Sequence, residues 1–265
     1  METAKQLADD AAQKIKDIAN VESINIGLTL GSGWAKAADL AGEEIASIDA
    51  SEIPGFHKPS VAGHTGKLRV IRLASGKHAL VVGARTHFYE GYGVDAVSHG
   101  VRVSAALGAE IMVLTNGAGG IKQSWSPGQP VIISDHINLT AHSPLSGANF
   151  IDLTDLYSSR IRKIALEVDE TLDQGVYVQF PGPHYETPAE VQMAKAMGGD
   201  IVGMSTALEA IAAREAGLEV FGMSLITNLA AGIQKTPLSH AEVIEAGQNA
   251  EPVIAKLLAQ IINKL

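Results

Sequence analysis

Short apolar runs recur along the chain, and several are rich in valine and isoleucine without alternating polar residues. Such runs fit strands that are buried on both faces, as in a mainly parallel sheet covered by helices. The second and third runs flank Ser75-Gly76, which predicts a hairpin. The predicted strands are Ile24–Leu30, Leu68–Leu73, Ala79–Val82, Ile111–Leu114, Val131–Ile133, Val176–Phe180, Ile201–Met204 and Val220–Ile226.

Helix signals lie between these runs. Thr187-Pro188-Ala189-Glu190 and Ser239-His240-Ala241-Glu242 both have the pattern of a capping box, and each predicts the start of a helix. Gly217 predicts the end of a helix over Ala207–Ala216. Because strands alternate with helices and no repeat or linker interrupts them, we expect an α/β fold in a single domain, residues 1–265.

Composition narrows the possible functions. The chain has no cysteine, which excludes a disulfide framework, a thiolate metal site and a thiol nucleophile. A formal net charge of -9 argues against nucleic acid as a partner, and any anionic ligand must be held by local charges and backbone amides. There is no signal-peptide pattern, no apolar run long enough to span a bilayer and no metal-ligand spacing of histidines, so we expect a cytoplasmic protein without membrane contact or metal.

Glycine-rich or polar residues follow most of the predicted strands. In an α/β sheet, ligands bind where the carboxyl ends of the strands meet, so these loops predict one composite site. They are Gly31-Ser32-Gly33, Gly83 with Arg85-Thr86-His87, Thr115-Asn116-Gly117-Ala118-Gly119-Gly120, Pro181-Gly182-Pro183-His184-Tyr185-Glu186, Ser205 and Thr227-Asn228.

Several of these motifs offer donors for an anion, and each also has a purely structural interpretation. Ser32 between two glycines would cradle a phosphate or form an ordinary turn, and it lies in neither a Walker loop nor a dinucleotide fingerprint. Arg85 and His87 suit phosphate capture but equally suit a surface ion pair in a packed loop. Asn116 also fits a tight turn, and His64 fits a structural histidine between glycines.

Other residues would suit a planar base or a sugar. Glu186 lies just before a helix start, so we expect it to stay ionised, either as an acceptor or merely as a complement to the helix dipole. Tyr185 would stack on a ligand or fill the core. Asn228 would bind a base or cap a loop. His240, in a first helical turn, would be neutral and bind a sugar hydroxyl, or be simply solvated.

Six segments, in this order, resemble the trimeric purine nucleoside phosphorylases of the short bacterial type. The similarity runs from the first predicted strand to the C-terminal helix. The segments are Gly31-Ser32-Gly33, Arg85-x-His87-x-Tyr89-Glu90-Gly91-Tyr92, Thr115-Asn116-Gly117-Ala118-Gly119-Gly120, Gly182-Pro183-His184-Tyr185-Glu186-Thr187, Val202-Gly203-Met204-Ser205-Thr206 and Leu225-Ile226-Thr227-Asn228.

The resemblance implies a three-layer α/β/α sandwich with a central mixed β-sheet. It also implies a homotrimer with sites near subunit interfaces, and no cofactor besides inorganic phosphate as co-substrate. Glu186, Asn228 and His87 are the implied catalytic residues. The implied ligand contacts are Ser32, Arg85, His87, Asn116, Gly117, Ser205 and His64 for phosphate, Tyr89, Met204, His240 and Phe150 for ribose, and Tyr185, Glu186, Thr227 and Asn228 for the purine.

Two positions depart from the family pattern. Longer members carry extra residues before the helix near Asp155, and a phenylalanine from that segment reaches the neighbouring subunit's ribose. Phe150 is the loose counterpart here. Gly117 stands where alanine is common, a change that we expect to be tolerated.

The resemblance implies reversible phosphorolysis of 6-oxopurine ribonucleosides and deoxyribonucleosides, such as inosine and guanosine, to a free base and a sugar 1-phosphate. Ionised Glu186 would accept the N1 hydrogen that these bases carry and adenine lacks. Three alternatives stay open. One is a methylthioadenosine phosphorylase, whose members carry aspartate at the position of Asn228. The others are a non-catalytic nucleoside or phosphate sensor, and a nucleoside hydrolase, whose clustered N-terminal aspartates are missing here.

Overall fold

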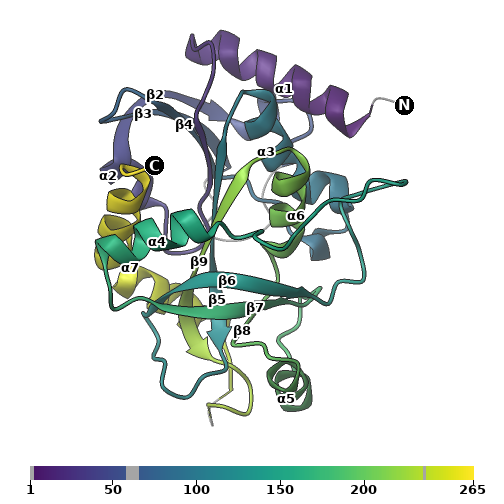
Figure 1. Ribbon diagram of the computed structural model, residues 1–265, viewed down its shortest axis with the longest axis vertical. Coiled ribbons are helices and arrows are strands. Elements are labelled where there is room, and N and C mark those ends of the chain that lie inside the picture. Colours follow the sequence, from purple (N-terminus) through teal and green to yellow (C-terminus); the bar gives the residue numbers. More distant parts are fainter. Residues whose placement is uncertain (1–2, 58–65, 235–236) are drawn as a thin grey trace.

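The computed structural model describes residues 3–57, 66–234 and 237–265. Within these ranges, nine strands form one mixed sheet in the order β2-β3-β4-β1-β5-β8-β7-β6-β9 (Figure 1). The strands are β1 Ile26–Thr29, β2 Gly42–Asp49, β3 Lys67–Leu73, β4 His78–Val82, β5 Ile111–Gly120, β6 Pro130–Asn138, β7 Asp173–Gln179, β8 Ile201–Gly203 and β9 Glu219–Leu229.

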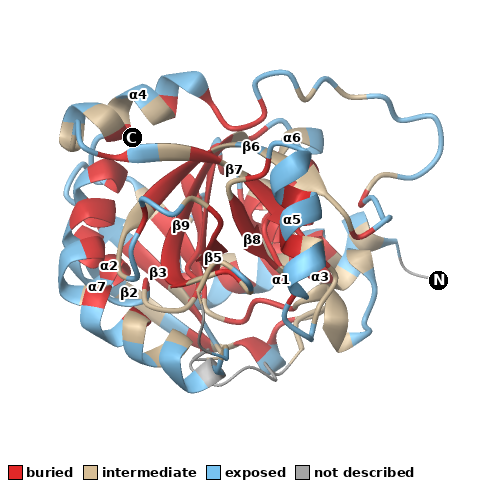
Figure 2. Cartoon of the chain, turned by 90° about the horizontal axis from the view of Figure 1, so that it is seen from below, coloured by how far each residue is buried: buried red, intermediate tan, exposed pale blue. Residues whose placement is uncertain are grey.

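Helices cover both faces of this sheet, which confirms the predicted three-layer α/β/α sandwich. On one face α1, α3 and α6 pack on the sheet, and on the other face α2, α4 and α7 do so. Buried residues concentrate on the strands between the layers, and exposed residues lie on the outer sides of the helices (Figure 2). The helices are α1 Ala4–Ala19, α2 Lys36–Ala41, α3 Val94–Ala106, α4 Ser159–Val168, α5 Pro188–Ala196, α6 Ala207–Glu215 and α7 His240–Ile262.

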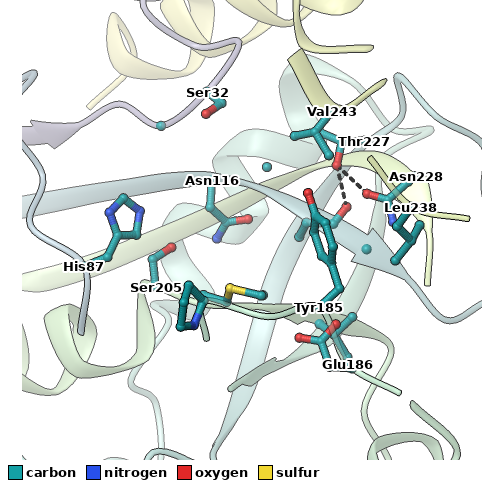
Figure 3. Close-up of a pocket in the computed structure, with 18 of the residues that line it drawn as sticks. Ser32, His87, Asn116, Tyr185, Glu186, Ser205, Thr227, Asn228, Leu238 and Val243 are labelled. Atoms are coloured by element: carbon teal, nitrogen blue, oxygen red, sulfur yellow. Dashed lines mark hydrogen bonds between the residues drawn. The ribbon is translucent and has the colours of Figure 1, made fainter. Parts of the chain in front are cut away.

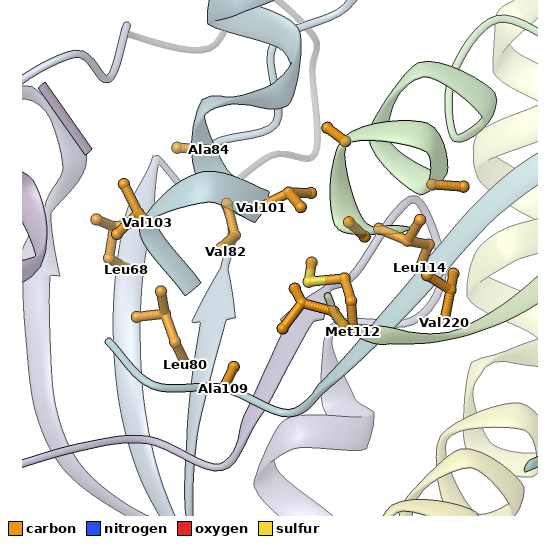
Figure 4. Packing of buried hydrophobic residues seen from close by; sticks show 14 of the residues in the cluster. Leu68, Leu80, Val82, Ala84, Val101, Val103, Ala109, Met112, Leu114 and Val220 are labelled. Atoms are coloured by element: carbon orange, nitrogen blue, oxygen red, sulfur yellow. The ribbon is translucent and has the colours of Figure 1, made fainter. Parts of the chain in front are cut away.

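The apolar runs form the core between these layers. On the face of α3, Leu80 and Val82 of β4 meet Val101 of the helix and Met112 of β5, all of them buried (Figure 4). Burial of such side chains contributes roughly 25 cal/mol for each Å² of apolar surface removed from water. This core fixes the strands whose ends carry the polar loops.

Strand β5 pairs with three other strands, β1, β8 and β9. Its first half, Ile111 to Leu114, pairs in parallel with β1, and Gly119 and Gly120 pair antiparallel with β8 on the same edge. Its other edge pairs in parallel with β9 over the whole strand. Because β9 continues through β6 and β7 to β8, these five strands close on themselves.

This closure corrects two expectations. The mainly parallel sheet with all carboxyl ends at one edge is wrong for β6, β7 and β8, which are parallel to one another and run antiparallel to β5 and β9. The loops after β7 and β8 still meet the loops after β1 and β4, because the closed part of the sheet brings them beside β5 and β9. In addition, the glycine-rich run after Leu114 and the pair Thr227-Asn228 are not loops, since both continue strands, in β5 and β9.

Other sequence predictions are confirmed. The hairpin at Ser75-Gly76 joins the antiparallel strands β3 and β4, and Gly76 has a φ of 84°. Thr187 caps α5 by accepting a hydrogen bond from the backbone of Glu190, and Ser239 caps α7. Strand β2 was not predicted, because its residues are mostly polar or half-buried at the edge of the sheet.

Candidate active site

A cavity of about 500 Å³ opens where β5, β8 and β9 meet. It is lined by residues from the ends of six strands and from the start of α7, so the predicted loops do converge. Of the predicted site residues, those that line it are Ser32, Arg85, His87, Tyr89, Asn116, Gly117, Tyr185, Glu186, Met204, Ser205, Thr227 and Asn228.

The cavity has two ends with different chemistry. Ser32, His87, Asn116 and Ser205 gather at one end, and Tyr185, Glu186, Thr227 and Asn228 at the other (Figure 3). The first group supplies hydroxyls, an amide and an imidazole. The second group supplies an aromatic ring, a carboxylate and an amide.

At the first end, the loop after β1 lies directly against β5. The backbone N–H of Gly31 donates to the Thr115 hydroxyl at 3.0 Å, and the indole of Trp34 donates to the Asn116 carbonyl at 3.0 Å. A side chain at Gly31 would meet the Thr115 carbonyl at 2.7 Å, so only glycine fits there. This contact places Ser32 beside Asn116.

Two of the three guanidinium nitrogens of Arg85 are held by hydrogen bonds at this end of the cavity. Its Nε donates to Glu209 at 3.0 Å, and its Nη1 donates to the Thr115 carbonyl at 2.7 Å. Its Nη2 is buried and has no hydrogen-bond partner among the described residues, and the same is true of Asn116 Oδ1. Buried polar atoms without partners are costly, so both atoms indicate a site made for a polar ligand.

His87 and Tyr89 form the rim of this end. The His87 backbone N–H donates to Glu90 at 2.6 Å, and its ring stacks on Tyr89 with 4.9 Å between ring centroids. Burial raises the pKa of Tyr89 to about 12, so its hydroxyl keeps its proton at neutral pH. The Tyr89 hydroxyl is therefore a neutral hydrogen-bonding group beside the Arg85 cation, and the His87 ring lies against the Tyr89 ring.

Glu186 is the acceptor at the other end. The residue is buried, and its Oε1 has no hydrogen-bond partner in the described part of the chain. Loss of solvation on burial raises the pKa of its carboxyl above the ordinary value. We expected the nearby helix start to favour the ionised form, but burial is the larger influence.

The amide of Asn228 has a fixed orientation. Its Oδ1 accepts from the Thr227 hydroxyl at 2.9 Å (Figure 3). Its Nδ2 donates to the Leu229 carbonyl at 3.1 Å. An amide nitrogen carries two hydrogens, so one more donor remains for a ligand. Asn228 thus presents a donor on the same side of the cavity as the Glu186 acceptor.

Three predicted residues are not brought to this cavity by the described structure. Phe150 lies on the segment between β6 and α4, 93% exposed and away from the lining. His64 lies outside the described residues. His240 is the first residue of α7, and its side chain is outside the described part.

Sequence reasoning missed four residues that shape the site. Leu238 and Val243, on either side of the α7 start, form an apolar wall near Tyr185. Thr206 and Glu209 lie behind the cavity and contact Asn116 and Arg85. The signal for this pair was present, since Thr206-Ala207-Leu208-Glu209 is a capping box.

No helix in the described ranges is long and apolar enough to cross a membrane. Among the same residues, no three His, Asp or Glu side chains lie close enough together to hold a metal ion.

Comparisons with known proteins agree with this site. Residues 25–263 match the phosphorylase superfamily. The chain is 61% identical to a purine nucleoside phosphorylase of Cellulomonas sp, over 97% of this chain and 93% of that protein. It is 50% identical to a purine nucleoside phosphorylase of Mycobacterium tuberculosis, over 97% and 96% of the two chains.

A solved structure shows the same fold. The crystal structure of Schistosoma mansoni purine nucleoside phosphorylase in complex with inosine superposes with a TM-score of 0.88 and 35% identity, covering 98% of this chain and 96% of that one. The predicted resemblance is therefore confirmed over nearly the whole sequence. The chain belongs to the phosphorylase superfamily and, within it, to the purine nucleoside phosphorylases.

Proposed function

We propose that this protein cleaves 6-oxopurine nucleosides, such as inosine and guanosine and their 2′-deoxy forms, with inorganic phosphate. The observation that carries the proposal is the pair of unsatisfied groups at opposite ends of one cavity. Arg85 Nη2 lies at one end as a free cationic donor, and Glu186 Oε1 lies at the other as a free acceptor. A nucleoside with a phosphate beneath its sugar would satisfy both.

At the phosphate end, each group has a distinct task. Arg85 supplies the positive charge, which a chain with a net charge of -9 must provide locally. Ser32, Ser205, the Gly117 backbone and His87 supply further hydrogen-bond donors around it. Asn116 Oδ1 accepts from a protonated phosphate oxygen or a sugar hydroxyl.

At the base end, Glu186 and Asn228 select the substrate. Glu186 accepts the N1 hydrogen of hypoxanthine or guanine, and Asn228 donates to the purine as it gains electrons. Adenine has no N1 hydrogen and would leave the buried carboxylate unpaired, so it is rejected. Tyr185 and the wall of Leu238 and Val243 bound the plane of the base, while Tyr89 and Met204 line the sugar.

The reaction exchanges one glycosidic bond for another. The carbon–nitrogen bond breaks with its electrons going to the purine, and a phosphate oxygen bonds to the anomeric carbon. Positive charge develops on the sugar next to the phosphate, and negative charge on the base next to Asn228. A preorganised donor of this kind contributes roughly 3 kcal/mol in other enzymes. Positioning and electrostatics suffice, so the proposed steps need no cofactor besides the phosphate.

The assembly is also part of the proposal. A fully exposed phenylalanine is a natural contact for a second copy of the chain. We propose that Phe150 packs against the sugar end of a neighbour's cavity in a homotrimer, and that His64 and His240 complete the phosphate and ribose contacts. A cytoplasmic location would suit the soluble nucleosides and phosphate that it consumes.

The test is an assay of purified protein with inosine, with and without inorganic phosphate. We expect hypoxanthine and ribose 1-phosphate in equal amounts, with a rate that depends on the phosphate concentration. Cleavage to free ribose at a rate indifferent to phosphate would indicate a hydrolase and contradict the proposal. Binding of inosine without any turnover would indicate a sensor.

A further inference from the structure

The residue after Ser205 has an unusual backbone conformation. Thr206 has φ 80° and ψ -52°, and the Ala207 N–H donates to the Ser205 carbonyl at 3.0 Å. These values define a γ-turn in the rare form with positive φ, which is strained for a β-branched residue. Such strain persists only where the surroundings hold the turn in place.

Glu209 holds this turn and Arg85 at the same time. Its Oε2 accepts from the Thr206 backbone N–H at 2.8 Å, and its Oε1 accepts from Arg85 Nε at 3.0 Å. The side chains of Arg85 and Glu209 are only 2% and 3% exposed, so both bonds are shielded from water. One carboxylate therefore fixes groups that come from the loops after β4 and β8.

The Thr206 hydroxyl connects a third strand to the same point. Asn116 Nδ2 donates to Thr206 Oγ1 at 2.9 Å, which turns Asn116 Oδ1 away as a free acceptor. Thr206 Oγ1 is also 3.2 Å from the Ser205 hydroxyl. Arg85 follows β4, Asn116 lies in β5 and Ser205 follows β8, and all three are bonded to Thr206 or Glu209.

We propose that Glu209 and Thr206 are positioning residues that set the geometry of the phosphate end without touching phosphate. The proposal rests on the proposed function, since it assigns that end to phosphate. Capping of α6 alone would require only the reciprocal bonds between Thr206 and Glu209. It would require neither the positive φ of Thr206 nor the pairing of Glu209 with Arg85.

The first variant is Glu209→Gln. Arg85 Nε and the Thr206 N–H donate to different oxygens of Glu209, and the amide replaces one of these oxygens with an NH2 group that can only donate, so one of the two bonds is lost. We expect the KM for phosphate to rise roughly ten- to a hundredfold while the KM for inosine changes by less than about twofold. Glu219→Gln is the matched control, because Glu219 also bonds an arginine, Arg160, and the cap serine of a helix, Ser158, but outside the cavity.

A second pair of variants keeps the test valid if Glu209→Gln does not fold. Thr206→Val preserves the branched shape and removes the acceptor for Asn116, whereas Thr206→Ser retains that acceptor. We expect the phosphate KM to rise several-fold in Thr206→Val, on the order of one lost buried hydrogen bond, and Thr206→Ser to lie closer to the wild type.

Phosphate binding measured without turnover separates the possible failures. Inorganic phosphate should raise the Tm of the wild type and of Glu219→Gln, and raise that of Glu209→Gln much less. A wild type that phosphate does not stabilise would contradict the proposed function itself. If Glu209→Gln binds phosphate as tightly as the wild type or more tightly, or if both KM values rise together, the positioning role is wrong.

Discussion

At the scale of single residues, the site is defined by polar atoms that the protein leaves unsatisfied. Glu186 Oε1, Arg85 Nη2 and Asn116 Oδ1 are buried, and no described residue bonds to them. Each of them weakens the folded state and strengthens ligand binding, which is the usual exchange at functional sites.

Glu186→Gln should reveal this exchange. Because burial raises the pKa of Glu186, the native state binds its proton more tightly than the unfolded state does. The stability linked to that proton is present below the unfolded pKa and is lost as pH rises through the folded pKa. We therefore expect Glu186→Gln to be more stable than the wild type at neutral pH, by about 1 kcal/mol, and no more stable at acidic pH.

The same substitution should lower the kcat/KM for inosine by roughly one to two orders of magnitude, because the carboxylate acceptor is lost. In the wild type, the KM for inosine should rise on acidification as Glu186 takes up its proton. Denaturant unfolding at two pH values and a pH profile of kcat/KM measure both effects. An unchanged acidic limb in Glu186→Gln would contradict the assignment.

Asn228→Asp tests the other half of base selection. The variant places an acceptor where the Asn228 Nδ2 donor stands, and the 6-amino group of adenine offers the matching hydrogen. We expect adenosine cleavage to rise and inosine cleavage to fall, so that their ratio of kcat/KM shifts toward adenosine by at least about tenfold. Parallel assays on both nucleosides decide this, and an unchanged ratio would show that Asn228 does not read the base.

At the scale of elements, the start of α5 fixes the position of Glu186. Thr187 and Glu190 form a reciprocal capping box directly after Glu186, with Pro188 as the first helical residue. This arrangement sets the direction in which the chain enters the helix. A local sequence signal therefore determines where the adjacent functional carboxylate is placed.

Thr187→Ala should cost about 1 kcal/mol of unfolding free energy through the lost cap, and it should also raise the KM for inosine. Thr3→Ala is the matched control, since Thr3 caps α1 by the same type of bond far from the cavity. We expect a similar loss of stability there with no change in KM. Equal KM values for inosine in the two variants would show that the Thr187 cap does not position Glu186.

The sequence predicted the elements that have strong local signals and missed those determined by distant contacts. The capping box at Thr187 and the hairpin at Ser75-Gly76 are local, and both were predictable. The continuation of β5 through its glycines depends on pairing with β8 and β9, which no local pattern reveals. The capping box of Thr206 and Glu209 is also a local signal, but the link from Glu209 to Arg85 spans 124 residues and no local pattern reveals it.

At the scale of the whole molecule, charge and substrate oppose each other. The chain carries a net charge of -9, yet its proposed co-substrate is an anion. The attraction that counteracts this repulsion comes from the buried Arg85, which salt screens less than it screens the exposed surface charges. We therefore expect moderate concentrations of an inert salt to lower the KM for phosphate and to leave the KM for the uncharged inosine unchanged.

Initial rates between low and physiological ionic strength measure this effect. A phosphate KM that rises steadily with salt would mean that exposed cations, and not the buried arginine, attract the anion.

The exposed Phe150 provides a test of the proposed trimer. If the proposed trimer forms and this side chain enters a neighbour's cavity, Phe150→Ala should raise the KM for inosine roughly ten- to a hundredfold, because roughly 1.5–3 kcal/mol of apolar burial is lost. Sedimentation should report three copies for the wild type. A monomer with full activity would contradict the proposal.

The parallel pairing of β5 and β9 has a further consequence. Asn228 is in register with Gly119, three residues beyond Asn116, so the base and phosphate ends lie about 10 Å apart along the strands at 3.3 Å per residue. The hydrogen bonds between the paired strands keep this spacing constant. We therefore expect the enzyme to select substrates by the distance between base and sugar as well as by their hydrogen-bonding groups. Nucleosides whose base is held farther from the anomeric carbon should not be cleaved.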